Sequence, residues 1–169
     1  AARAIELNAF DYGVLGMTVP QRKSFYGLPW LTGEMGAAHI GGPTIMQACA
    51  TSARVLVQAA QEVASGAADC ALTITADRVS NGPHLYYPNP QGAGGSGESE
   101  DWVLGNFDKD PLAGCNMLTT AENCARKWQV SREEQHALVV RRYEQYRAAT
   151  TPDADGRTFQ SRYMVTPLA

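Results

Sequence analysis

The chain has 169 residues, of which 44% are hydrophobic and 18% charged, and its formal net charge at pH 7 is -3. This length suits one well-buried domain, no stretch approaches the roughly 18 consecutive apolar residues of a membrane span, and the first residues lack the pattern of a signal peptide. Acidic and basic residues are interleaved, so there is no basic face for a nucleic-acid backbone. We therefore expect a cytoplasmic protein that binds neither membranes nor nucleic acids.

Strands and helices alternate in the first 80 residues. A short helix is expected at 3–10, and a longer one from Ser52 to Gly66, which is a favourable C-cap residue. Apolar runs containing β-branched residues predict strands at 12–19, 43–49 and 69–76. Because strands that alternate with helices form parallel sheets covered by helices, the expected fold class is α/β with a mostly parallel core sheet.

Residues 81–114 interrupt this alternation, since they are crowded with Gly, Pro, Asn and Ser. A stretch of this kind inside a compact domain is commonly functional or mobile, and we expect an irregular excursion that leaves the sheet and returns. Its segment GAGGSG, at 92–97, has the G-x-G-x-x-G spacing of dinucleotide-binding turns. Such a turn follows a strand and opens a helix, whereas this one precedes ESEDW, so we interpret it as a flexible loop.

Two helices are expected after the excursion. Thr119 precedes Glu122, and Ser131 precedes Glu134, at the spacing of a capping box. A turn and a final alternating strand from residue 161 should follow.

The four cysteines form no CxxC pair and have no histidine at zinc-finger spacing; they are Cys49, Cys70, Cys115 and Cys124. We expect no structural metal site and no disulfide framework, and we expect four reduced thiols, most of them buried as small apolar residues.

Cys49 differs from the other three, because it lies between a predicted strand and a predicted helix with Thr51 and Ser52 as expected N-caps. The amide groups and dipole of a helix N-terminus stabilise a thiolate, and the carboxyl edge of a parallel sheet is where such sheets bind ligands. Cys49 is therefore a candidate nucleophile; the alternative is a buried thiol that closes the turn. A Cys–His hydrolase would need His39, His84 or His136 beside it.

Two stretches carry a family resemblance. CATSARVLVQAAQEVASGAADCALTITADRVSNGPHL, from Cys49, and NMLTTAENCARKWQVSREEQHALVVRRYEQ, from Asn116, resemble in order the N-terminal half of a thiolase. Thiolases carry a nucleophilic cysteine in an N-R-x-C-x-S-G-like turn, then an S-M-S-N-x-P-like segment, H-M-G-x-T-A-E-N and S-R-E-E-Q-D. TAEN at 120–123 and SREEQ at 131–135 match letter for letter.

The resemblance implies an acyl-CoA C-acyltransferase in which Cys49 is acylated and the acyl group then passes to CoA or to the enolate of acetyl-CoA. Leu112 and Met117 would line the pantetheine channel, with Asn116 beside the acyl site. CoA would be a substrate, no metal or redox cofactor is implied, and a homodimer or homotetramer is expected. Residues 1–80 and 138–169 would form an incomplete core domain, and 81–137 a loop domain over CoA.

Some positions depart from the family pattern. Asn116 replaces the usual histidine, Leu118 the following glycine, and Thr51 with Ser52 the S-G pair. The family's activating histidine and second cysteine belong to a C-terminal half that this chain lacks, so we expect the chain alone to be inactive. The alternative is a thiolase-like protein that binds acyl-CoA or a partner protein without completing the reaction, and a cysteine-dependent hydrolase is a third hypothesis.

Overall fold

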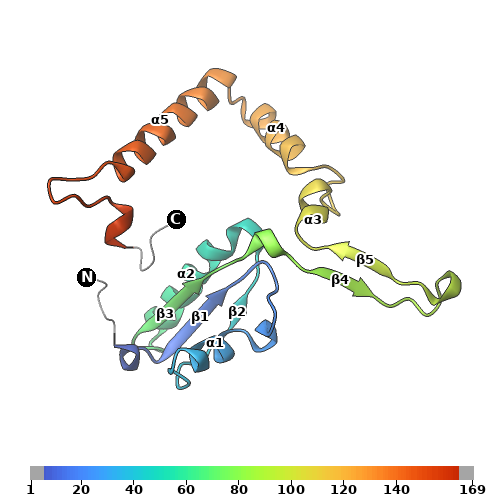
Figure 1. The fold of residues 1–169 in the computed structure, drawn as a ribbon, viewed down its shortest axis with the longest axis horizontal. Coiled ribbons are helices and arrows are strands. Elements are labelled where there is room, and N and C mark those ends of the chain that lie inside the picture. Colours follow the sequence, from blue (N-terminus) through green and yellow to red (C-terminus); the bar gives the residue numbers. More distant parts are fainter. Residues whose placement is uncertain (1–5, 164–169) are drawn as a thin grey trace. The chain divides into compact units, whose positions relative to one another are not determined.

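The computed structural model describes residues 6–163, which divide by packing into two compact units. Glu6–Asn116 form one unit, and the described residues from Met117 onward belong to the other. Each unit is described separately below (Figure 1). The division into a core domain and a loop domain expected from the sequence stays a prediction.

The first unit contains a parallel sheet of three strands in the order β2-β1-β3 (Figure 1). Its strands are β1 (Tyr12–Gly16), β2 (Thr44–Ile45) and β3 (Ala71–Thr75). Leu15 of β1 pairs with Thr44, and Tyr12 pairs with Ala71. The expected α/β class with a parallel core sheet is confirmed, although the strands predicted at 12–19, 43–49 and 69–76 are all shorter than expected.

Helices cover both faces of this sheet. Successive side chains of β1 point to opposite sides, so neighbouring residues of the strand contact different helices. On one face Val14 packs with Val55 and Ala59 of α2 (Thr51–Ser65), and all three are buried. On the other face, a Cβ atom on Gly13 would lie 2.9 Å from the side chain of Leu28 in α1 (Leu28–Glu34). The close approach of α1 therefore requires glycine in the central strand.

Helix α2 ends as its sequence predicts but is apolar on two faces. Gly66 is the C-cap residue and adopts a left-handed conformation with φ 75°. Val55 is fully buried against the sheet, whereas Leu56 and Val63 are 60% and 43% exposed. The apolar residues of α2 therefore form two stripes along the helix. The sheet buries the stripe that contains Val55, and the stripe that contains Leu56 and Val63 is exposed.

The excursion is more regular than its composition predicts. It contains an antiparallel hairpin of β4 (His84–Tyr87) and β5 (Glu98–Asp101), followed by α3 (Leu104–Asp108). The expectation of irregular chain over 81–114 is therefore wrong where these elements lie. Each of the two strands has only four residues, which is too short for a clear alternation of apolar and polar residues. The glycine-rich segment 92–97 connects two strands, as expected of a loop and unlike a dinucleotide-binding turn.

The second unit contains α4 (Met117–Trp128) and α5 (Arg132–Thr150). The predicted capping box of α5 is confirmed, since the Ser131 side chain accepts a hydrogen bond from the Glu134 amide and the Glu134 carboxylate accepts one from the Ser131 amide. The capping box predicted at Thr119 is wrong, because α4 already begins at Met117.

The ends of the chain differ from expectation where they are described. The helix predicted at 3–10 is a single 3-10 turn at Leu7–Ala9, and residues 1–5 lie outside the described chain. The strand predicted from residue 161 begins instead in a 3-10 helix at Gln160–Arg162, and its remainder after Tyr163 lies outside the described residues. Within 6–163, no helix is long and apolar enough to cross a membrane.

Candidate nucleophile site at the carboxyl edge of the sheet

The chain segments that follow the three strands meet at one edge of the sheet, because all three strands run in the same direction. Thr18 follows β1, Cys49 follows β2 and Asp77 follows β3. This edge is where an open parallel sheet offers functional side chains to a ligand.

Cys49 lies at the centre of a 3-10 turn, Ala48–Ala50, that leads directly into α2. Cys49 is exposed, and its thiol forms no hydrogen bond with another residue of the first unit, Glu6–Asn116. Ala48 has φ 42°, in the left-handed region that costs a residue with a Cβ atom free energy. The turn therefore presents the thiol to solvent at a local cost in backbone strain.

Thr51 closes this turn. Its hydroxyl accepts a hydrogen bond from the Gln47 amide at 2.8 Å and donates one to the Ala48 carbonyl at 2.7 Å, and the residue is only 5% exposed. Thr51 and Ser52 were expected to be N-caps, which is wrong: Ala50 is the N-cap residue and has no side-chain cap. Thr51 instead uses its hydroxyl to hold the strained turn against the start of the helix.

Asp77 fastens the end of β1 to the end of β3. Its carboxylate accepts hydrogen bonds from the amides of Thr18 and Val19, at 2.8 and 2.9 Å, and from the Thr18 hydroxyl. The carbonyl of Thr18 accepts a 2.9 Å hydrogen bond from the indole N–H of Trp102, which comes from the excursion. The sequence analysis missed both Asp77 and Trp102. Asp77 had one local signal, since it is an acidic residue just after a predicted strand, whereas Trp102 had none.

The opposite edge of the sheet carries a second carboxylate clamp. Asp11 accepts hydrogen bonds from the amides of Asp69 and Cys70, at 2.8 and 3.0 Å, just before β3 begins. These two backbone hydrogen bonds hold the pKa of the Asp11 carboxyl below its ordinary value of 3.8. Burial, followed by the negative charge of Glu62, raises the pKa of the neighbouring Tyr12.

His39 and His84, the two histidines of the first unit, form no hydrogen bond with the Cys49 thiol within the described part of that unit. No disulfide joins any of the four cysteines; Cys124 is exposed and Cys70 and Cys115 are half-buried. The expectation that most are buried is therefore wrong, as is the interpretation of Cys49 as a buried thiol.

The family model described as "Thiolase, N-terminal domain" matches residues 28–157. The chain belongs to the thiolase family. The match includes β2, Cys49, α2, β3, the excursion and both helices of the second unit. The resemblance noted from the sequence is confirmed.

Curated relatives of this thiolase chain are named acetyl-CoA acetyltransferase. The protein from Saccharomyces pastorianus is 28% identical over 116 residues, covering 68% of this chain and 29% of the relative. The protein from Shinella zoogloeoides is 32% identical over 115 residues, with 66% and 28% covered. A cytosolic acetyl-CoA acetyltransferase from Rattus norvegicus is 32% identical over 92 residues, with 54% and 23% covered. The matched part of the chain thus covers less than a third of the length of these relatives.

The residues that the family resemblance would place at an acyl-CoA site fall in different units. Leu112 belongs to the first unit and is 97% exposed. The Asp110 side chain accepts hydrogen bonds from the amides of Leu112 and Ala113. Asn116 is the last residue of the same unit, and Met117 begins α4 in the second. Their substrate-binding roles stay predictions.

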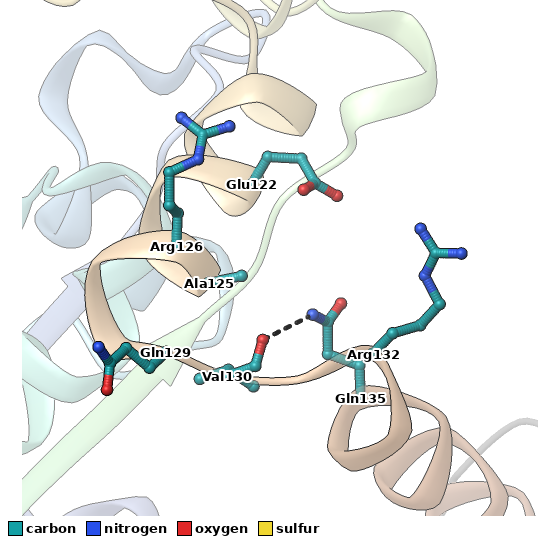
Figure 2. Close-up of a pocket in the computed structure, with 7 residues that line it drawn as sticks. All are labelled: Glu122, Ala125, Arg126, Gln129, Val130, Arg132 and Gln135. Atoms are coloured by element: carbon teal, nitrogen blue, oxygen red, sulfur yellow. Dashed lines mark hydrogen bonds between the residues drawn. The ribbon is translucent and has the colours of Figure 1, made fainter.

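A pocket of the thiolase chain lies in the second unit, where α4 leads into α5 (Figure 2). It is lined by Glu122, Ala125, Arg126, Gln129, Val130, Arg132 and Gln135. The Gln135 side chain donates a 3.5 Å hydrogen bond to the Val130 carbonyl across the helix junction, as Figure 2 shows. No residue predicted to act in catalysis or substrate binding lines this pocket, so Cys49 and its turn are the candidate site.

Proposed function

We propose that this chain is the nucleophile-bearing part of an acyl-CoA C-acyltransferase that works by a ping-pong mechanism through Cys49. The observation that carries the proposal is an exposed thiol on a strained turn that opens a helix at the carboxyl edge of a parallel sheet, in a chain of the thiolase family. The relatives named acetyl-CoA acetyltransferase support the choice of CoA thioesters as substrates.

In the first half-reaction the Cys49 thiolate attacks the carbonyl carbon of an acyl-CoA. In the condensation direction the attacked carbonyl belongs to the thioester, the new carbon–sulfur bond joins the acyl group to Cys49, and CoA leaves as its thiolate. In thiolysis the attacked carbonyl is the 3-keto group of a 3-ketoacyl-CoA, and the carbon–carbon bond breaks with acetyl-CoA leaving as its enolate. In the second half-reaction the acyl group passes to the enolate of acetyl-CoA in condensation, which forms a carbon–carbon bond, or to the CoA thiolate in thiolysis, which forms the shortened acyl-CoA. Both routes free Cys49 for another cycle.

The Cys49 thiol needs a proton acceptor to form the thiolate, and amide groups at the N-terminus of a helix stabilise such an anion. Acyl exchange between thiols involves no change in oxidation state, so CoA enters as a substrate and we propose no metal or redox cofactor. Because the matched part of this chain covers less than a third of the length of its relatives, the complete reaction is proposed for the protein in its full expressed length. We propose further that it is a cytoplasmic homodimer or homotetramer.

A second candidate is a thiolase-like protein that binds acyl-CoA without completing the transfer. Two observations favour it. Cys49 has no hydrogen bond to a base within the first unit, Glu6–Asn116. Asn116 and Leu118 occupy positions where the family pattern has histidine and glycine. Both candidates predict CoA binding, and only the first predicts an acyl-cysteine.

Mass spectrometry of the intact, full-length protein after incubation with acetyl-CoA separates the two candidates. The transferase should gain one acetyl group that maps to Cys49, and CoA should remove it. Cys49→Ala should abolish the adduct, whereas Cys124→Ala, at the other exposed thiol, should retain it. CoA binding without an adduct would favour the second candidate, and release of free acetate without any thiolysis product would instead indicate a hydrolase.

A further inference from the structure

The β4–β5 hairpin leaves the first unit through a narrow base. Gly82 approaches Val103 so closely that a Cβ atom on the glycine would lie 2.4 Å from a methyl carbon of the valine. The Trp102 amide donates a 3.1 Å hydrogen bond to the Pro83 carbonyl, one step beyond the pairing of His84 with Asp101. The two ends of the hairpin are thus held together before the chain continues to α3.

Trp102 attaches this base to the sheet. Its indole N–H donates a 2.9 Å hydrogen bond to the carbonyl of Thr18, a residue 84 positions earlier in the chain, and its side chain is half-buried. Thr18 is itself held through its amide and hydroxyl by Asp77. The amide, hydroxyl and carbonyl of Thr18 thus all form hydrogen bonds. These bonds fix the position of the Thr18 carbonyl, which accepts from the indole, at the edge of the sheet that also carries Cys49.

The chain beyond this anchor leads to the predicted acyl-CoA residues. The Asp101 carboxylate accepts hydrogen bonds from the amides of Val103 and Leu104, at 3.1 and 2.9 Å, and so sets the start of α3. Helix α3 ends at Asp108, only a few residues before Leu112 and Asn116. The course of this segment therefore depends on where Trp102 fastens the base.

We propose that Trp102 is a positioning residue for acyl-CoA: its hydrogen bond to Thr18 sets segment 104–116 relative to the edge that carries Cys49. The inference rests on the proposed function, because it assigns this segment to the acyl-CoA site. Trp102 acts on the affinity for the thioester and leaves the intrinsic reactivity of the thiol unchanged.

Three full-length proteins test the proposal: the parent, Trp102→Phe, which keeps an aromatic ring but removes the N–H donor, and Trp128→Phe. Trp128 is a matched control because it is 71% exposed and lies at the end of α4 in the other unit. For each protein, the rate of Cys49 acylation is measured against acetyl-CoA concentration, and the rate of Cys49 alkylation by iodoacetamide is measured without acetyl-CoA.

Trp102→Phe should raise the half-saturating concentration of acetyl-CoA about three- to tenfold, the range expected for losing one net hydrogen bond. Its maximal acylation rate and its alkylation rate should equal those of the parent, and Trp128→Phe should equal the parent throughout. An unchanged half-saturating concentration in Trp102→Phe, or a parallel loss of alkylation, would overturn the positioning role alone. A parent that is never acylated would overturn the proposed function, and the inference with it.

Discussion

The hydroxyl of Thr51 bridges the amide of Gln47 and the carbonyl of Ala48, so the first residue of α2 closes the turn that carries Cys49. A threonine at a helix start commonly caps the helix with its side chain. Here the same side chain serves the preceding turn, and the shape of the nucleophile turn depends on it.

Replacing Thr51 by valine should lower the free energy of unfolding by about 1–3 kcal/mol, because the substitution removes two hydrogen bonds at a buried position without changing the side-chain volume. Thr51→Ser keeps the hydroxyl and should lose less. Urea-induced unfolding of both full-length variants provides the comparison. Equal losses in the two variants would mean that the methyl group, which faces Gly16, contributes more than the hydroxyl.

Replacing Ala48 by glycine should raise the free energy of unfolding by about 1 kcal/mol. The present residue has φ 42°, and glycine adopts this conformation without the strain imposed by a Cβ atom. Ala48→Val should lower the free energy of unfolding instead, since a β-branched residue tolerates the left-handed region poorly. A destabilised Ala48→Gly protein would show that the strain at Ala48 is small.

The core of the fold was predictable from the sequence, because its signals are local. The β-branched runs of β1 and β3 and the helical spacing that ends at Gly66 each follow from neighbouring residues. The same holds for the capping box at Ser131, whose two partners are three residues apart. Sequence reasoning also identified Cys49 as the candidate nucleophile.

The details of the site were not predictable, because they depend on conformations and contacts without a sequence pattern. Nothing in the sequence indicates a left-handed conformation at Ala48, and the hydroxyl of Thr51 has more than one local acceptor to choose from. The hydrogen bond from Trp102 to Thr18 joins residues that only the tertiary fold brings together. The prediction of Thr51 and Ser52 as N-caps was wrong because it rested on residue type, which does not show which backbone group a hydroxyl will bind.

Gly42 and Gly36 provide a paired test of the backbone beside β1. A Cβ atom on Gly42 would lie 1.9 Å from the carbonyl oxygen of Gly13, so Gly42→Ala should lower the free energy of unfolding by at least about 3 kcal/mol. Gly36 has φ 76° with no atom near its Cβ position, so Gly36→Ala should cost only about 1 kcal/mol. Chemical unfolding of both variants checks the order, and a Gly42→Ala protein as stable as Gly36→Ala would contradict it.

The clamp at Asp11 should make stability depend on acid pH. Its folded-state pKa lies below the ordinary value of 3.8, so its stabilising effect is fully present above that value and is lost as the pH falls through the folded pKa. Asp11→Asn cannot titrate and should lose less stability than the parent over the same acid range. Unfolding midpoints measured at successive pH values test this.

Asp108→Asn is the control for this pH series, because the Asp108 carboxylate is exposed and accepts no hydrogen bond from a residue in the described part of the chain. Its stability should fall with pH in parallel with the parent. If the stability of Asp11→Asn also falls in parallel with that of the parent, the hydrogen bonds from Asp69 and Cys70 to Asp11 do not make stability depend on protonation of the Asp11 carboxyl.

The anchored base of the hairpin also determines where the chain can change in length. At the base, Gly82 has no room for a side chain beside Val103, and one additional residue between Gly16 and Thr18 would carry the acceptor of the indole away from it. At the tip, Gly94 and Gly95 face open space. Insertions should therefore be tolerated at the tip and rejected at the base, which makes the segment around Gly94 the place to insert an epitope tag or a fluorescent label.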